Sequence, residues 1–230
     1  MTKIFCDIAD LKLIRKFNKK TIVKGFTTNP SLMRKAGAKD YAKYSQKILK
    51  ITNKPVSFEV FADDMENMIL QGKQISKWST NIFVKVPITN SKGKFTGKVI
   101  NELNRNKIKL NITAVYSSKQ TEKILKVINK KTKVIISIFA GRMADNGKDP
   151  IPQLIKSINI SKKYKNVEIL WASTREPYNY LQSKKIRCHI ITVPPTIIEK
   201  IEKFGKSFKH LTVDTVKGFL LDSKKSKFKL

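Results

Sequence analysis

The chain has 230 residues, 40% of them hydrophobic, which supplies a complete core for one large domain and excludes a disordered chain. The formal net charge is +31, but only six of the 48 basic residues are arginine. Because base recognition favours the planar fork of arginine and the lysines are spread along the chain, we expect no specific nucleic-acid partner; the charge suits a small anionic substrate.

Apolar, β-branched runs alternate with longer amphipathic stretches along the whole chain, without a linker or a break in composition. Eight runs have the composition of strands: Lys3–Asp7, Ile22–Thr27, Val56–Phe61, Ile82–Pro87, Lys109–Val115, Val134–Phe139, Glu168–Ala172 and His189–Val193. Helical patterns follow them: Ala9–Phe17, Tyr41–Ile51, Met65–Lys77, Lys94–Arg105, Ser118–Asn129, Pro152–Lys163, Arg175–Gln182 and Thr196–Phe204. A last helix is predicted at about Val213–Asp222.

Eight strands, each followed by a helix, are typical of a closed barrel of parallel strands. We therefore predict an α/β protein, a (β/α)8 TIM barrel with an extra C-terminal helix, forming a single catalytic domain over residues 1–230. An open, doubly wound sheet is the alternative, but no G-x-G-x-x-G motif follows the first predicted strand.

Several features predict a cytoplasmic protein. No run approaches the roughly 18 apolar residues of a membrane span, so no membrane partner is expected. The beginning of the chain has the pattern of a strand and lacks the apolar region of a signal peptide. Cys6 and Cys188 lack the spacing of metal ligands and fall in predicted strands, so we expect them to be small core residues in a reducing compartment.

The alternation of residues separates an apolar from a polar face in four consecutive predicted strands. The apolar residues of the fourth strand leave Lys85 on the opposite face. The neighbouring strands are expected to turn Phe58, Ile112, Ala114 and Ile136 toward the helices and to leave Ser57, Glu59, Asn111, Thr113, Ser137 and Phe139 facing the interior. A barrel interior is normally filled by aliphatic side chains, so polar groups near the carboxyl ends of strands indicate an active site. Asp7 and Ser173 extend the same pattern at the first and seventh strands.

Lys85 is the most informative of these residues. A lysine in the run Ile82–Pro87 is costly to bury. In such a site a lysine can lose its proton near neutral pH, and the free amine then attacks carbonyl groups. Lys24 also lies within a strand, but it lacks the polar neighbours that surround Lys85, so it is the weaker candidate.

Three loops carry further candidate groups, each with a purely structural alternative. Asn29 places an amide at the barrel mouth or simply caps a helix. Arg142 binds a phosphate or pairs with Asp145 on the surface. Ser173 and Arg175 stand beside a helix start, which is a natural phosphate site.

Taken together, these motifs resemble the transaldolase family in its short-chain subgroup. The resemblance runs from Cys6 to the final helix and is carried by Asp7 after Phe5-Cys6, Thr27-Thr28-Asn29-Pro30-Ser31, Val84-Lys85-Val86-Pro87, Asn111-Ile112-Thr113-Ala114, Phe139-Ala140-Gly141-Arg142 and Ser173-Thr174-Arg175. The chain departs from the family at Ile138 and Ala140, where Pro and Val are frequent, and at Trp171, which replaces a small residue and is expected to narrow the site.

The resemblance implies transfer of a dihydroxyacetone unit from a ketose phosphate to an aldose phosphate, a step of the non-oxidative pentose phosphate pathway. Lys85 would form a Schiff base with the donor, Asp7 would act as the general base at the C4 hydroxyl, and Glu59 with Thr113 would position water. The resemblance also gives the binding residues: Asn29, Asn111 and Ser137 for the hydroxyls, and Arg142, Ser173 and Arg175 for the phosphate. It implies phosphorylated sugars as partners, no metal or other cofactor, and a homo-oligomer.

Two alternatives remain open at this stage. Fructose-6-phosphate aldolases belong to the same family, but have Gln at the position of Glu59 and Tyr at that of Phe139. A tyrosine hydroxyl there favours release of dihydroxyacetone, whereas Phe139 protects the bound enamine until an acceptor arrives. The more distant alternative is a barrel recruited as a basic nucleic-acid-binding protein.

Overall fold

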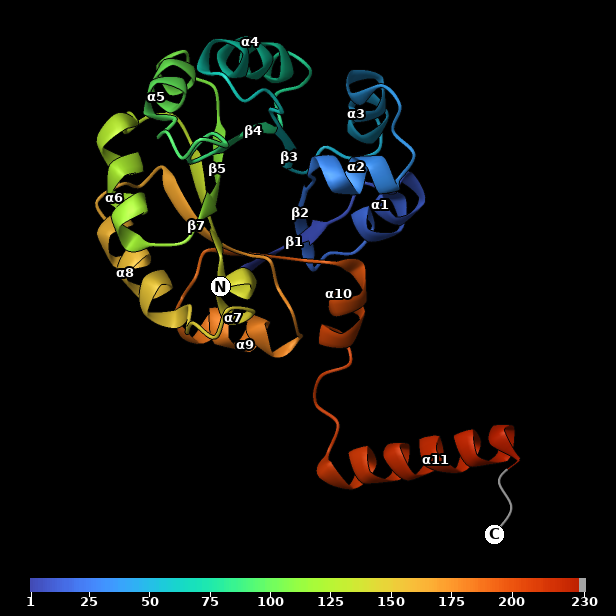
Figure 1. Ribbon diagram of the computed structural model, residues 1–230. Coiled ribbons are helices and arrows are strands. Elements are labelled where there is room, and N and C mark those ends of the chain that lie inside the picture. Colours follow the sequence, from blue (N-terminus) through green and yellow to red (C-terminus); the bar gives the residue numbers. More distant parts are fainter. Residues whose placement is uncertain (228–230) are drawn as a thin grey trace.

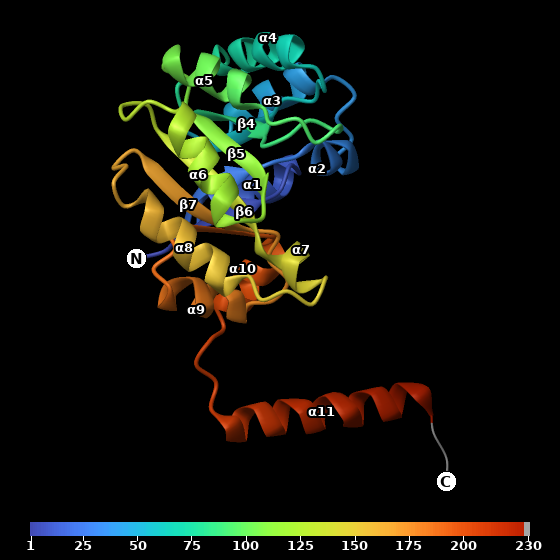
Figure 2. The same cartoon turned by 60° about the vertical axis from the view of Figure 1, so that its left-hand side comes forward.

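The computed structural model describes residues 1–227 and shows a closed barrel of eight parallel strands in the order β1 to β8 (Figures 1 and 2). Each strand pairs with the next, and β8 pairs with β1 through Lys3 and Ile190 among others. The prediction of a (β/α)8 barrel with an extra C-terminal helix is therefore confirmed. No helix among the described residues is long and apolar enough to cross a membrane.

The eight predicted strands are all present, with ends that differ by at most a few residues. They are β1 Lys3–Asp7, β2 Val23–Thr27, β3 Val56–Glu59, β4 Ile82–Pro87, β5 Leu110–Val115, β6 Val134–Phe139, β7 Val167–Ala172 and β8 Ile190–Val193. The helices that match the predicted patterns are α1 Leu11–Asn18, α3 Tyr41–Leu49, α4 Met65–Ser76, α5 Gly97–Arg105, α6 Ser118–Val127, α8 Ile151–Ser161, α9 Tyr178–Lys185 and α10 Pro195–Ile201.

Three helices differ from the sequence prediction. The short helices α2 (Pro30–Lys35) and α7 (Ala140–Ala144) were not predicted, because their few residues do not establish a helical period. The last helix, α11, covers Phe208–Ser226 and is longer than the predicted Val213–Asp222. The side chain of Ser207 caps its first turn by accepting a hydrogen bond from the backbone N–H of His210.

The main hydrophobic core lies between the strands and the surrounding helices, as the strand alternation predicts. It includes Phe58, Val84, Ile112 and Ile136, which are fully buried. Cys6 and Cys188 are buried free thiols, as expected for small core residues. At Ala114 the prediction is wrong: this residue adopts a positive φ of 58° and the β5–β6 register shifts, so Val115 enters the core instead.

A second, smaller core fills the barrel itself. Its members are Phe5, Phe83, Ile135, Leu170, Ala172 and Ile190. Gly25 makes room for it, because a Cβ there would lie 2.6 Å from the ring of Phe5. On several strands the residue two positions after an interior apolar residue is polar: Asp7 follows Phe5, and Lys85 follows Phe83. The interior is therefore apolar at one level and polar at the carboxyl ends of the strands.

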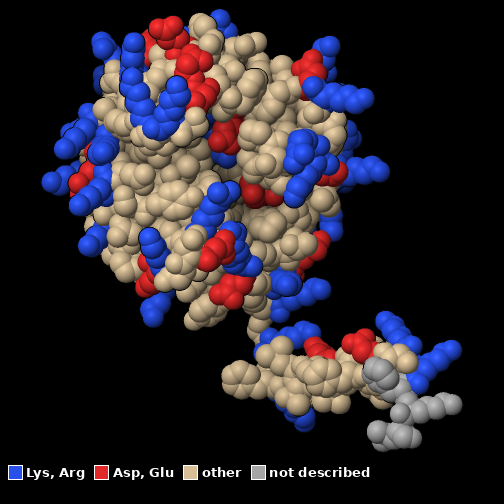
Figure 3. Space-filling model, viewed as in Figure 1, with Lys and Arg blue, Asp and Glu red and all other residues tan. Residues whose placement is uncertain are grey.

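Helix α11 stands away from the barrel in both ribbon views (Figures 1 and 2). None of its residues is buried, although it carries large apolar side chains such as Leu211, Val216 and Phe219. Gly205, with φ of 102°, lies in the connection after α10 and allows the backbone to turn there. Lysine and arginine side chains are spread over the visible face of the barrel rather than gathered in one patch (Figure 3).

Candidate active site

A cavity of about 320 Å³ opens at the carboxyl ends of the strands. Of the eleven residues predicted for the site, ten line this cavity, and Glu59 lies beside it against Lys85. The lining residues are Asp7, Thr27, Asn29, Leu32, Lys85, Asn111, Thr113, Ser137, Phe139, Arg142, Ala172, Ser173, Thr174, Arg175, Thr192 and Pro194. The polar interior set and the loop residues therefore meet in one place.

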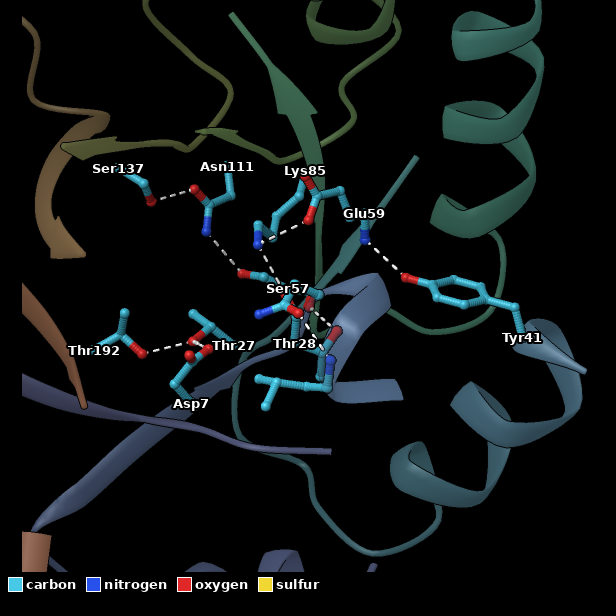
Figure 4. Close-up of polar contacts among 12 residues, drawn as sticks. Asp7, Thr27, Thr28, Tyr41, Ser57, Glu59, Lys85, Asn111, Ser137 and Thr192 are labelled. Carbon is cyan, nitrogen blue, oxygen red and sulfur yellow. Dashed lines mark hydrogen bonds and ion pairs between the residues drawn. The ribbon is translucent and has the colours of Figure 1, made fainter. Parts of the chain in front are cut away.

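Lys85 is buried in this cavity, with 7% of its surface exposed. Its Nζ lies 3.1 Å from Glu59 Oε2 and donates a hydrogen bond of 2.8 Å to the backbone carbonyl of Thr28 (Figure 4). Strand register explains the carboxylate contact, since Glu59 on β3 and Lys85 on β4 are direct neighbours. The rival Lys24 is exposed on β2, so it lacks the buried setting that reactive amine chemistry requires.

Asp7 ends β1 and faces the same cavity. Its Oδ1 accepts a 2.6 Å hydrogen bond from the Thr27 hydroxyl, which also contacts the Thr192 hydroxyl at 2.6 Å (Figure 4). Because the single hydrogen of Thr27 points to Asp7, Thr192 is the donor to Thr27. Burial raises the pKa of Asp7, and the bond from Thr27 and the charge of Lys85 oppose that rise. Asp7 therefore holds a proton more readily than an exposed aspartate.

A hydrogen-bonded row crosses the interior beside Lys85. The Ser137 hydroxyl donates to Asn111 Oδ1 at 2.6 Å, and Asn111 Nδ2 donates to the Ser57 hydroxyl at 3.0 Å. This row fixes the orientation of the Asn111 amide, since both of its polar atoms are engaged. The hydroxyl of Thr113 is buried and has no hydrogen-bond partner among the described residues, so it is free to bond to a substrate or water.

The rim of the cavity holds two arginines that differ in their ion pairing. Arg175 donates from Nε to Asp145 at 2.9 Å and from Nη1 to the Ser173 carbonyl at 3.0 Å. The alternative that Arg142 pairs with Asp145 on the surface is thus wrong, because Asp145 pairs with Arg175. Arg142 lies over the ring of Phe139, 5.8 Å from its centroid, and forms no salt bridge within residues 1–227.

The loop after β7 packs directly on helix α7. Ser173 has a positive φ of 62°, and its carbonyl approaches Gly141 so closely that an added Cβ would lie 1.6 Å away. Only glycine permits this contact, which holds Arg142 and Arg175 on the same rim. Asn29 meets both of its predicted roles: its side chain caps α2 by accepting from the Leu32 N–H, and it lines the cavity.

One sequence expectation about the site is wrong, and two contributing residues were missed. Trp171 does not narrow the cavity; it packs in the core between strands and helices and is absent from the cavity lining. Thr192 was missed, although its position between the apolar Ile191 and Val193 would have indicated an interior residue. Tyr41, whose hydroxyl accepts a hydrogen bond from the Glu59 N–H, was also missed, and no local pattern marks it.

The cavity at the mouth of this (β/α)8 barrel holds a buried lysine among carboxyl, amide and hydroxyl groups. This combination at the carboxyl ends of the strands is typical of an enzyme active site. Residues 4–230 match the model of the family described as Transaldolase/Fructose-6-phosphate aldolase. A "Probable transaldolase" of Methanococcus vannielii is 32% identical over 222 residues, 96% of each chain. Another, of Nitrosopumilus maritimus, is 35% identical over 230 residues, 98% of this chain and 96% of that one. The chain belongs to the transaldolase/fructose-6-phosphate aldolase family.

The contact at Gly141 gives a first prediction. Gly141→Ala should force the loop after β7 away from α7 and lower the free energy of unfolding by about 1–3 kcal/mol. Urea unfolding measures this effect. Gly218→Ala is the matched control, because nothing lies within 4 Å of a Cβ at that position. Equal behaviour of the two variants would contradict the assignment of Gly141.

Proposed function

We propose that this protein is a cytoplasmic transaldolase of the non-oxidative pentose phosphate pathway that forms a Schiff base through Lys85. It would transfer a dihydroxyacetone unit from fructose 6-phosphate or sedoheptulose 7-phosphate to an aldose phosphate. The observation that carries the proposal is the buried Nζ of Lys85 in a cavity that also contains Asp7 and rim arginines. Membership of the family supports the reaction class.

The first half of the reaction uses Lys85 and Asp7. Glu59 takes a proton from the Lys85 ammonium, and the neutral amine attacks the donor C2 carbonyl. Glu59 then returns that proton to the carbinolamine hydroxyl, which leaves as water and gives a protonated imine. Asp7 takes the proton of the C4 hydroxyl, the C3–C4 bond breaks, and its electron pair moves into the imine to form an enamine. An aldose phosphate leaves with the new carbonyl. A carboxylate whose pKa is raised by burial suits a base that must later return its proton.

The second half reverses these steps with a different aldehyde. The enamine carbon attacks the acceptor carbonyl, Asp7 returns its proton to the new hydroxyl, and water hydrolyses the imine. We assign Glu59, 3.1 Å from Lys85, and the Thr113 hydroxyl, which has no hydrogen-bond partner within residues 1–227, to positioning water at the imine carbon. Asn29, Asn111 and Ser137 would hold substrate hydroxyls along the cavity wall.

The rim provides the phosphate site in this proposal. Arg142 has no carboxylate partner among the described residues, so its full charge and hydrogen-bonding fork are available to a phosphate. Arg175 is already bound to Asp145, and Ser173 stands beside it. We therefore assign the stronger phosphate contact to Arg142 and a supporting one to Ser173 and Arg175.

The second candidate function is a fructose-6-phosphate aldolase, which would release dihydroxyacetone. Phe139 favours transfer over release. Its ring lines the cavity, packs 6.0 Å from that of Tyr116 and lies under Arg142. The side chain of Phe139 itself carries no hydroxyl that could direct a proton or water to the enamine. Glu59 matches the transaldolase pattern at the second position that separates the two activities.

We also propose that the protein is a homo-oligomer in which α11 docks on a second copy of the chain. The helix buries none of its own apolar side chains, yet the family match extends through it, so it is part of the common sequence of the family. The barrel exposes Ile155, Tyr178 and Leu181 on α8 and α9, which are apolar groups of the kind that such a helix covers.

Reduction of the imine tests the catalytic proposal. Borohydride added with fructose 6-phosphate should leave a stable adduct on Lys85, found by mass mapping of proteolytic peptides. Lys85→Ala should abolish the adduct and lower kcat by about a thousandfold or more, whereas the exposed control Lys24→Ala should retain both. Turnover that survives Lys85→Ala would rule the proposal out.

Substitution of Phe139 tests the choice between transfer and release. Phe139→Tyr should raise the rate of dihydroxyacetone release without acceptor by at least about tenfold, because a phenol can donate a proton to the enamine. Phe204→Tyr, on an exposed side chain, is the control. Release by the wild-type protein at the rate of transfer would instead identify it as the aldolase.

The oligomer is tested by the molar mass in solution. Light scattering should give a multiple of 26.4 kDa for the full chain. Leu211→Glu combined with Phe219→Glu should give the monomer, because these substitutions place charge on the apolar side chains of α11. Lys209→Glu on the same helix should keep the oligomer. A monomeric wild-type protein at micromolar concentration would disprove this arrangement.

A further inference from the structure

The hydrogen-bond ladder between β2 and β3 ends one rung before the level of Glu59 and Lys85. The strands pair at Phe26 with Val56 and at Thr27 with Ser57, and the last rung is the bond from the Thr28 N–H to the Ser57 carbonyl at 3.1 Å. In a regular parallel ladder the next rung would run from the Glu59 N–H back to the Thr28 carbonyl. That rung is not formed, and the two groups have other partners.

The Glu59 N–H donates to the hydroxyl of Tyr41 at 2.9 Å, and the Thr28 carbonyl accepts from Lys85 Nζ at 2.8 Å. Figure 4 shows Tyr41 reaching the backbone of Glu59 from outside the barrel, while Lys85 approaches from within. The tyrosine thus replaces the carbonyl as the acceptor for the Glu59 amide. The carbonyl of Thr28 is left for the lysine.

Tyr41 is held firmly in this position. It is the first residue of α3, which Asp40 caps by accepting from the Lys43 N–H at 2.9 Å. Its ring makes contacts with Phe58, Phe61 and Trp78 at centroid distances of 5.5–6.4 Å. Burial also raises the pKa of the Tyr41 phenol, so the group stays neutral at physiological pH and meets the amide as a hydroxyl.

We propose that Tyr41 is a positioning residue for Lys85: by accepting the Glu59 N–H, it prevents the last β2–β3 rung from closing and reserves the Thr28 carbonyl for the lysine. Lysine has a flexible four-carbon stem, so Nζ needs acceptors on two sides to stay in one place. Glu59 Oε2 and the Thr28 carbonyl are those acceptors. By accepting the Glu59 N–H, Tyr41 acts on both of these acceptors without touching substrate. The catalytic consequence rests on the function proposed above; the structural consequence does not.

The test is Tyr41→Phe, which keeps the ring contacts and removes only the hydroxyl. The Glu59 amide should then close the rung to Thr28 and displace Lys85 Nζ. We expect kcat for transfer and the rate of borohydride trapping to fall by about 10- to 100-fold. The KM for fructose 6-phosphate should stay within about twofold, because the phosphate and hydroxyl contacts are unchanged. The midpoint of urea unfolding should change little, because the Glu59 amide exchanges one acceptor for another and the displaced Lys85 Nζ can bond to water in the cavity.

Tyr44→Phe is the matched control. Tyr44 lies on the same helix, and its hydroxyl donates to the carbonyls of Ala9 and Ala36 and not to a group of the β2–β3 ladder. Its removal should leave kcat unchanged. A parallel loss of kcat and stability in both variants would show a merely structural role and overturn the proposal, as would Tyr41→Phe with wild-type kcat.

A crystal structure of Tyr41→Phe separates this inference from the proposed function. It should show the Glu59 nitrogen within hydrogen-bonding distance of the Thr28 oxygen, and Lys85 Nζ no longer bonded to that oxygen. If the wild-type protein gives no borohydride adduct, the proposed function fails, and these two distances still decide the role of Tyr41. An open rung with Lys85 in its original place would overturn the inference.

Discussion

The arrangement of this site depends on how the charge of Lys85 is accommodated inside the barrel. A buried cation is costly unless it is paired and hydrogen-bonded. Here the carboxylate of Glu59 and the carbonyl of Thr28 lie within 3.1 and 2.8 Å of Nζ. The carboxylate is supplied by the register of β3 with β4, and the carbonyl by the early end of the β2–β3 ladder. The lysine is therefore held by backbone geometry as much as by side chains.

The two levels of the barrel interior divide stability from chemistry. Apolar residues such as Phe5 and Phe83 fill one level, and the next inward-facing residues, Asp7 and Lys85, carry the polar groups. Because parallel strands all end at the same mouth, inward-facing polar residues at their carboxyl ends meet around one cavity. Asp7 is deep enough for burial to raise its pKa, whereas Arg142 and Arg175 on the rim are exposed.

The alternation of strands with helices was sufficient to predict the barrel. The period of two within the strands was sufficient to predict most of the side chains that line the cavity, because it assigns each inward side chain without tertiary information. The period of two failed where the backbone leaves it, as at Ala114, where a positive φ accompanies a shift in the β5–β6 register. Trp171 was expected to narrow the site because it replaces a small residue of the family. The alternation along its strand instead places it with the outward-facing residues, in the core between strands and helices. The pairing of Asp145 with Arg175 and the contact of Tyr41 with Glu59 join segments far apart in the chain, so no local pattern specifies them.

In the mechanism that we propose, the donor sugar is bound covalently at Lys85, with its C4 hydroxyl at Asp7 and its phosphate at the rim. The most direct measurement is a crystal structure of the borohydride-reduced complex with fructose 6-phosphate. We expect a bond from Nζ of Lys85 to C2, the C4 hydroxyl in contact with the Asp7 carboxylate, and the phosphate bonded to Arg142. An adduct on another lysine, or a C4 hydroxyl remote from Asp7, would contradict it.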